Sequence, residues 1–221
     1  MNIFDILIQY KTAFLLWLAT TLKICLLTRW FWIFFGIVLW VLIGKYSLIR
    51  KVHVWISTII GWIPVLVLLY WMYFPMQQAL NINIDSFLLA TICFVVVNTI
   101  LVTNIIYEWI KNLPNQYVIA WKLCGLSESI ILKKIKIPLV FKHVIWPILI
   151  VQITMLHTSI FASLINVDDI FRQIQRVNAI VYKPIELYTI LALFFVIISV
   201  PIYVFANNLK RKYTKDFSER I

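Results

Sequence analysis

Glycine occurs only four times in the 221 residues, and charged residues make up only 13% of the chain. No segment alternates apolar and polar residues for long, so the sequence argues against a transmembrane β-barrel. The three cysteines form no Cys-x-x-Cys pair and have no metal-ligand spacing to the three histidines, so no metal site is predicted. Acidic residues are scarce, at nine against 20 lysines and arginines.

Long apolar segments are what the chain has in abundance, because 63% of its residues are hydrophobic. Several runs reach the roughly 20 residues that a helix needs to cross a bilayer. We predict an all-α integral membrane protein with a single transmembrane domain over residues 1–221. The predicted spans are residues 13–43, 54–75, 86–108, 143–165 and 186–206.

The first predicted span is too long for one straight crossing and contains Lys23 and Arg29. We therefore expect the crossing nearer 24–43, with the opening turns along the interface and both basic side chains snorkelling or facing protein. Asp5 lies where a signal peptide carries net positive charge, so we expect the N-terminal segment to be retained.

Lysine and arginine are distributed unequally between the predicted loops. Fourteen fall on the side of the C-terminus and four on the opposite side. The positive-inside rule then predicts a cytoplasmic C-terminus and, with five spans, an N-terminus outside. Membrane topology thus accounts for most of the net charge of +11, and no nucleic-acid partner is predicted.

The longest predicted cytoplasmic loop covers residues 109–142 and reads as two short helices. Pro114 can open the first helix, Gly125 can end it in a left-handed conformation, Ser127 can cap the second, and Pro138 can end that one. Both helices have apolar surfaces that require a partner, which from composition alone is either the lipid surface or another protein.

The spacing of this loop resembles the Glu-Ala-Ala loop of the membrane subunits of ABC importers, whose helices dock on an ATPase. Ala120, Gly125, Ile135 and Pro138 stand at matching positions, and Ile137 replaces a leucine. The sequence departs from the family at Ile119 and Trp121, which replace the glutamate and the second alanine. The resemblance implies a type I importer permease fold with a cytoplasmic coupling-helix pair, whose coupling residues are Ala120, Trp121, Gly125, Ser127, Ile135, Ile137 and Pro138.

Five further segments are similar to permeases for polar amino acids such as histidine, glutamine and arginine. They are "TLKICLLT" (21–28), "GWIP" (61–64), "VNTI" (97–100), "HTSIFAS" (157–163) and "YKPIELY" (182–188). The resemblance implies an ATP-driven importer of polar amino acids in a bacterial inner membrane. Its implied partners are an ATPase dimer, a second permease (identical or related), and a solute-binding protein received by the outer loops.

The chain itself has no phosphate-binding loop, because its one Gly-Lys pair, Gly44-Lys45, is followed by Tyr46. We expect no cofactor on this chain, ATP and Mg²⁺ used by the partner ATPase, and no enzymatic activity of its own. Polar residues at membrane depth are candidates for the substrate path. They are Asn98, Thr99, Thr154, His157, Thr158 and Ser159.

Two alternatives remain open. The departures at Ile119, Trp121 and Ile60, where the family has an arginine before Gly61, also suit a specialised or reduced permease subunit for another solute. A secondary transporter or membrane scaffold without an ATPase is the other alternative. Secondary transporters typically have inverted repeats and broken helices, and the sequence indicates neither.

Overall fold

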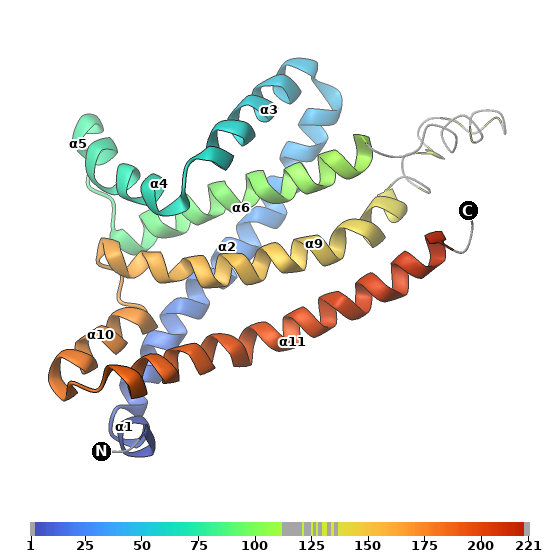
Figure 1. The fold of residues 1–221 in the computed structure, drawn as a ribbon. Helices are drawn as coiled ribbons and strands as arrows, with labels where there is room; N and C mark the ends of the chain where they lie inside the picture. Colours follow the sequence, from blue (N-terminus) through green and yellow to red (C-terminus); the bar gives the residue numbers. More distant parts are fainter. Residues whose placement is uncertain are drawn as a thin grey trace.

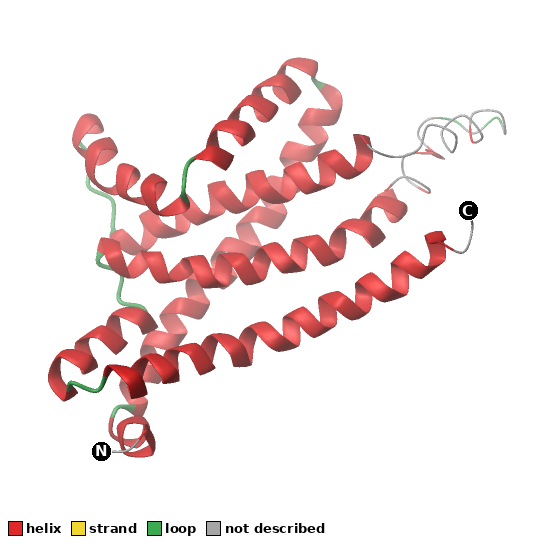
Figure 2. Cartoon of the chain, viewed as in Figure 1, coloured by secondary structure: helices red, strands yellow, loops and turns green. Residues whose placement is uncertain are grey.

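The computed structural model describes residues 3–111, 121, 125, 127, 130, 131, 134 and 137–218. Every element in this part of the chain is helical, and Figure 2 shows helices joined by short loops. The helices are α1 Ile3–Gln9, α2 Lys11–Lys45, α3 Ser47–Trp62, α4 Val65–Trp71, the π-helix η1 Met72–Met76, α5 Gln77–Leu80, α6 Ser86–Lys111, α9 Ile137–Thr158, the 3-10 helix η3 Ser159–Ile165, α10 Ile170–Val181 and α11 Pro184–Ser218.

Four helical segments are long and apolar enough to cross a membrane, and a bent helix pair supplies a fifth candidate. This agrees with the number and order of the predicted spans. The four are Lys11–Trp40, Ser86–Lys111, Ile137–Ile165 and Pro184–Tyr213, and the bent pair is Ser47–Trp62 with Val65–Leu80.

The second span is broken, contrary to the expectation of unbroken spans. Its two halves meet at an angle of 100°. Pro64 follows the break, and Ile63 before it is extended, with φ −90° and ψ 120°. A proline disfavours helical geometry at the preceding residue and has no N–H to donate, which explains why α3 ends here.

The first and the last span are longer than predicted. α2 is continuous from Lys11 to Lys45, so no break separates its opening turns from the crossing, and the short separate helix is α1. α11 continues beyond residue 206 to Ser218. At 1.5 Å per residue these 35-residue helices are roughly 52 Å long, well beyond the roughly 30 Å hydrocarbon core.

α6 is the central helix of the bundle. Of its most apolar window, 61% is buried, compared with 18% for α2 and 11% for α11. α6 packs against both α2 and α9, and α11 packs along the other side of α9 (Figure 1). The outward faces of α2 and α11 are exposed and apolar, as expected for surfaces that contact lipid or another subunit.

The termini lie at opposite ends of the bundle, as an odd number of crossings requires. Figure 1 shows the N-terminus near α10, while the C-terminus lies at the end where α6 finishes and α9 begins. The basic residues of the C-terminal end include Arg50, Lys51, Lys111, Lys142, Lys210, Arg211 and Lys212.

Candidate functional site

A pair of buried amides connects α6 to α9 at mid-depth. Asn98 Nδ2 donates to Gln152 Oε1 at 3.4 Å, and Gln152 Nε2 donates to Asn98 Oδ1 at 3.2 Å. Asn98 is completely buried and Gln152 is 6% exposed. Because α6 is centred near Asn98, this reciprocal pair lies where water is excluded and an unpaired amide is costly.

The threonines predicted for the substrate path fall into two groups. Thr154 donates to the carbonyl of Ile150 at 3.2 Å, and Thr158 donates to that of Thr154 at 2.8 Å. These hydroxyls are satisfied within their own helix. The buried Thr99 hydroxyl on α6, like that of Thr103 one turn further along, has no hydrogen-bond partner.

His157 lies on an exposed face of α9, where it faces α11. Its Nε2 lies 2.9 Å from Ser199 Oγ, and its ring meets Phe195 edge to face at 5.7 Å between centroids. Ser159 is buried, and its hydroxyl donates to the carbonyl of Leu156 at 2.7 Å. The six predicted path residues therefore form no single site: Asn98 and Thr99 lie inside the bundle, and Thr154 and His157 lie on its surface.

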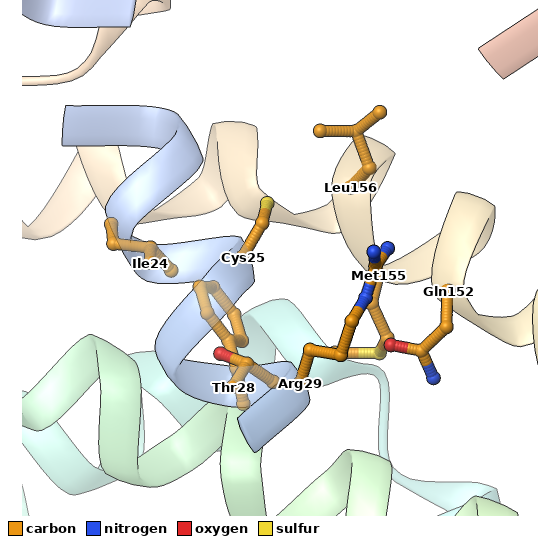
Figure 3. A pocket seen from close by; sticks show the side chains of 8 residues that line it. Ile24, Cys25, Thr28, Arg29, Gln152, Met155 and Leu156 are labelled. Atoms are coloured by element: carbon orange, nitrogen blue, oxygen red, sulfur yellow. The ribbon is translucent and has the colours of Figure 1, made fainter. Parts of the chain in front are cut away.

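Two polar residues at the same depth, one buried and one half-buried, were not among the predicted path residues. Gln152 is one, and Arg29 is the other. Arg29 extends from α2 toward Met155 and Gln152 of α9, beside a small cavity (Figure 3). The sequence signal for both is a strongly polar side chain in the middle of an apolar span, which is costly without a partner or a function.

The end of the bundle that carries α10 is organised by charges. Asp169 caps this helix, with its Oδ1 accepting from Arg172 N at 2.9 Å. Arg172 Nη1 donates to the carbonyl of Ser163, and Asp168 pairs with Arg172 and Arg176 at 3.3 and 2.8 Å. The mixed charges of this loop thus fix α10 to η3.

Asp169 is itself buried, unlike its neighbour Asp168. Burial raises the pKa of Asp169 from 3.8 to about 7, although the hydrogen bond from Arg172 N and the charge of Arg172 act in the opposite direction. Its second oxygen, Oδ2, has no partner. The start of α10 is further held to α2, because Ile170 N donates to Thr21 Oγ1 at 3.2 Å.

Two local predictions for the cytoplasmic loop are confirmed. Gly125 has a φ of +71°, in the left-handed region. Ser127 Oγ accepts from Ile130 N at 3.4 Å, as an N-cap does, and Ile131 is buried. Trp121 is helical and half-buried.

The other predicted coupling residues lie either outside the described residues or in the first turn of α9. Ala120 and Ile135 lie outside the described residues. Ile137 and Pro138 belong to the first turn of α9, so Pro138 lies near the start of a span. A proline is tolerated in a first turn because the N–H there has no intrahelical partner. Among the described residues, no group of three or more histidine, cysteine or acidic side chains is placed to hold a metal ion.

Comparison with known families matches residues 32–215 to a family described as "Binding-protein-dependent transport system inner membrane component". The chain belongs to this family. It is therefore a multi-pass inner-membrane protein and a permease subunit of an ABC importer, a transport subunit as predicted. Family membership also removes the alternatives of a secondary transporter and a scaffold.

Individual relatives are similar to this chain over almost its whole length. The "Arginine transport system permease protein ArtQ" of Bacillus subtilis (strain 168) is 25% identical over 199 residues, 88% of this chain and 90% of ArtQ. A crystal structure of "an amino acid ABC transporter with histidines" has the same fold, with a TM-score of 0.86, 20% identity, and coverage of 96% of this chain and 99% of that one. An inward-facing structure of the MetNI methionine ABC transporter gives a TM-score of 0.71 at 17% identity, covering 93% and 98%.

Proposed function

We propose that this permease imports a polar amino acid. The observation that carries the proposal is its likeness to an arginine permease over 88% of the chain. The buried amides of Asn98 and Gln152 and the charge of Arg29 supply polar groups at mid-depth, as passage of a polar solute requires.

The energy is proposed to come from a partner ATPase that uses ATP and Mg²⁺, because the chain has no phosphate-binding loop of its own. Its dock is the loop over residues 114–138. The left-handed Gly125 and the capped helix start at Ser127 give this loop a defined elbow, as needed to transmit closure of an ATPase dimer to the spans as a rigid-body movement.

The proposed orientation of the permease in the membrane follows from the distribution of its lysines and arginines. The end of the bundle that carries Lys111, Lys142 and Lys210 is proposed to be cytoplasmic, with the N-terminus and α10 outside. A solute-binding protein would then dock at the end that carries α10. A second permease, identical or related, would cover part of the exposed apolar surface of the bundle.

Uptake into proteoliposomes tests the assignment. The permease is purified with an ATPase and a solute-binding protein of this transporter class from the same organism, reconstituted, and supplied with ATP inside and radiolabelled L-glutamine, L-glutamate or L-arginine outside. We expect ATP-dependent accumulation of at least one of the three. Accumulation of none, with an assembly that hydrolyses ATP, overturns the amino-acid assignment and favours a permease for another solute, the second candidate suggested by the unusual Trp121.

A further inference from the structure

Arg29 is half-buried and lies near the middle of α2, far from both membrane surfaces. It lies 18 residues from the start of α2 and 16 from its end, roughly 27 and 24 Å along the helix axis. The neighbours that share its cavity include Phe94 of α6 and Gln152 of α9, both within about 7 Å along the axis of the centres of their spans. An arginine side chain cannot snorkel over such a distance.

The cavity beside Arg29 presents hydrogen-bond donors that have no acceptor. Arg29 Nε is buried without a hydrogen-bond partner, and so is the hydroxyl of the preceding residue, Thr28. Both residues line the cavity, together with Cys25, Gln152 and Met155 (Figure 3). At about 10 Å³ the cavity is near the lower limit for one water molecule, so in this conformation it admits a single small polar group.

Among the residues that the structure describes, no acidic side chain is positioned to neutralise Arg29. Glu108 is the acidic residue nearest to the middle of a span, and it is ten residues, or roughly 15 Å, from Asn98 along α6. The acidic residues are Asp5, Asp85, Glu108, Glu128, Asp168, Asp169, Glu186, Asp216 and Glu219. No described part of the permease therefore compensates the charge on Arg29, which is costly unless a ligand supplies the counter-charge.

We infer that Arg29, with Thr28, receives a carboxylate of the transported solute and makes the path selective for solutes without net positive charge. A carboxylate offers the acceptors that Arg29 Nε and the Thr28 hydroxyl lack, and arginine binds carboxylates in a directional, charge-assisted way. A solute with a cationic side chain meets repulsion at the same point. The inference rests on the proposed function and narrows its substrate class to acidic or uncharged polar amino acids, although the relative ArtQ is named for arginine.

Binding to the purified full-length permease, with the subunits that co-purify, tests this selectivity without depending on the preference of the binding protein. The probes are L-glutamate, succinate and L-arginine at constant ionic strength, and the readout is ligand-induced thermal stabilisation. We expect glutamate and succinate to stabilise the wild type and arginine not to. Arg29→Gln should weaken the apparent affinity for the acidic probes by roughly tenfold or more and abolish the preference over arginine.

Two further variants separate selectivity from structural damage. Lys23→Gln removes a positive charge from an exposed position of the same helix and should bind as the wild type does. Arg29→Lys keeps the charge but loses the Nε donor and should retain the order of preference at reduced affinity. If Arg29→Gln does not fold, unchanged affinity and preference in Arg29→Lys overturn the assignment of Arg29 Nε to the carboxylate.

The outcomes distinguish this inference from the amino-acid assignment. Stabilisation by succinate but by no amino acid, lost in Arg29→Gln, supports the role of Arg29 and removes amino acids as substrates. Stabilisation by L-arginine to the same degree in the wild type and in Arg29→Gln keeps the amino-acid assignment and overturns the role of Arg29. Equal responses of both proteins to every probe, including no response, also overturn it.

Discussion

Asn98 of α6 and Gln152 of α9 exchange two hydrogen bonds in the interior of the bundle, although 54 residues separate them in the chain. Each amide satisfies the other where neither has access to water. The pair therefore fixes the relative position of α6, the central helix, and α9, the helix that follows the predicted coupling loop. Any movement of the loop that slides α9 along α6 must break or re-form these two bonds.

Replacing both members of this pair should destabilise the protein by less than the sum of the two single replacements. Asn98→Leu or Gln152→Leu leaves a buried amide unpaired, at a cost of about 1–3 kcal/mol in the free energy of unfolding. The double variant leaves none, so its loss should fall short of the sum of the single losses by about 0.6–1.7 kcal/mol, the range of interhelical hydrogen bonds in membranes. Unfolding in SDS measures all four proteins, and strict additivity would contradict a direct bond.

Stability should depend on pH through Asp169. Its pKa is about 7 in the folded protein against 3.8 ordinarily, so the folded state holds the proton more tightly than the unfolded chain. The contribution of this group to the free energy of unfolding is thus fully present below pH 4 and is lost as pH rises toward 7 and above. Asp169→Asn should flatten this decline and unfold at a higher temperature than the wild type at pH 8, because an asparagine also caps α10.

The matched control for Asp169 is Asp85, which also accepts backbone hydrogen bonds at a helix start but is exposed to water. Asp85→Asn should keep the pH dependence of the wild type. Thermal unfolding midpoints between pH 5 and pH 8 in one detergent decide the matter. A decline in Asp169→Asn as steep as in the wild type would assign the pH dependence to another group.

Gly125 should matter for coupling rather than for folding. Its φ of +71° strains any residue with a Cβ, by roughly 1–2 kcal/mol, although no atom of the described residues lies within 4 Å of where that Cβ would be. Gly125→Val should therefore leave the amount of protein in the membrane unchanged and reduce both ATPase co-purification and transport. Gly61→Ala is the control, because Gly61 is equally open but helical. Normal ATPase retention by Gly125→Val would remove this loop as the dock.

Local features of the sequence were sufficient to predict most of the elements. Apolar run length located the spans, since a helix must satisfy its own backbone wherever it crosses lipid. Gly125 and Ser127 were predictable because a left-handed turn and a helix cap depend on single residue types. α11 continues past residue 206 because Lys210, Arg211 and Lys212 favour a helix even where hydropathy falls.

Features that depend on tertiary structure were missed. The role of Gln152 depends on its hydrogen bonds with Asn98. The pattern of residues 143–165 cannot predict a partner that lies 54 positions away in the chain. The bend of 100° at Pro64 could have been predicted, because proline disfavours helical geometry at the preceding residue. The apolar run continues through Pro64, so run length alone predicts one unbroken span. The sequence shows Arg29 as a charge within a span, but only the packing of α2 against α6 and α9 shows that it faces protein.

The C-terminal part of α11 should be held to α9 by two contacts between cations and aromatic rings. Lys210 Nζ lies 4.5 Å from the centre of the Trp146 ring, and Lys142 Nζ lies 6.0 Å from that of Tyr213. Each helix thus supplies one cation and one ring.

Trp146→Leu removes the shorter contact but keeps an apolar side chain, and should cost about 0.5–1 kcal/mol. We expect faster amide hydrogen exchange over residues 205–213, because this segment has lost one of its two anchors. Arg211→Gln, which removes an exposed charge from the same segment, should exchange as the wild type does. Equal exchange in Trp146→Leu and the wild type would show that helix propensity alone maintains the end of α11.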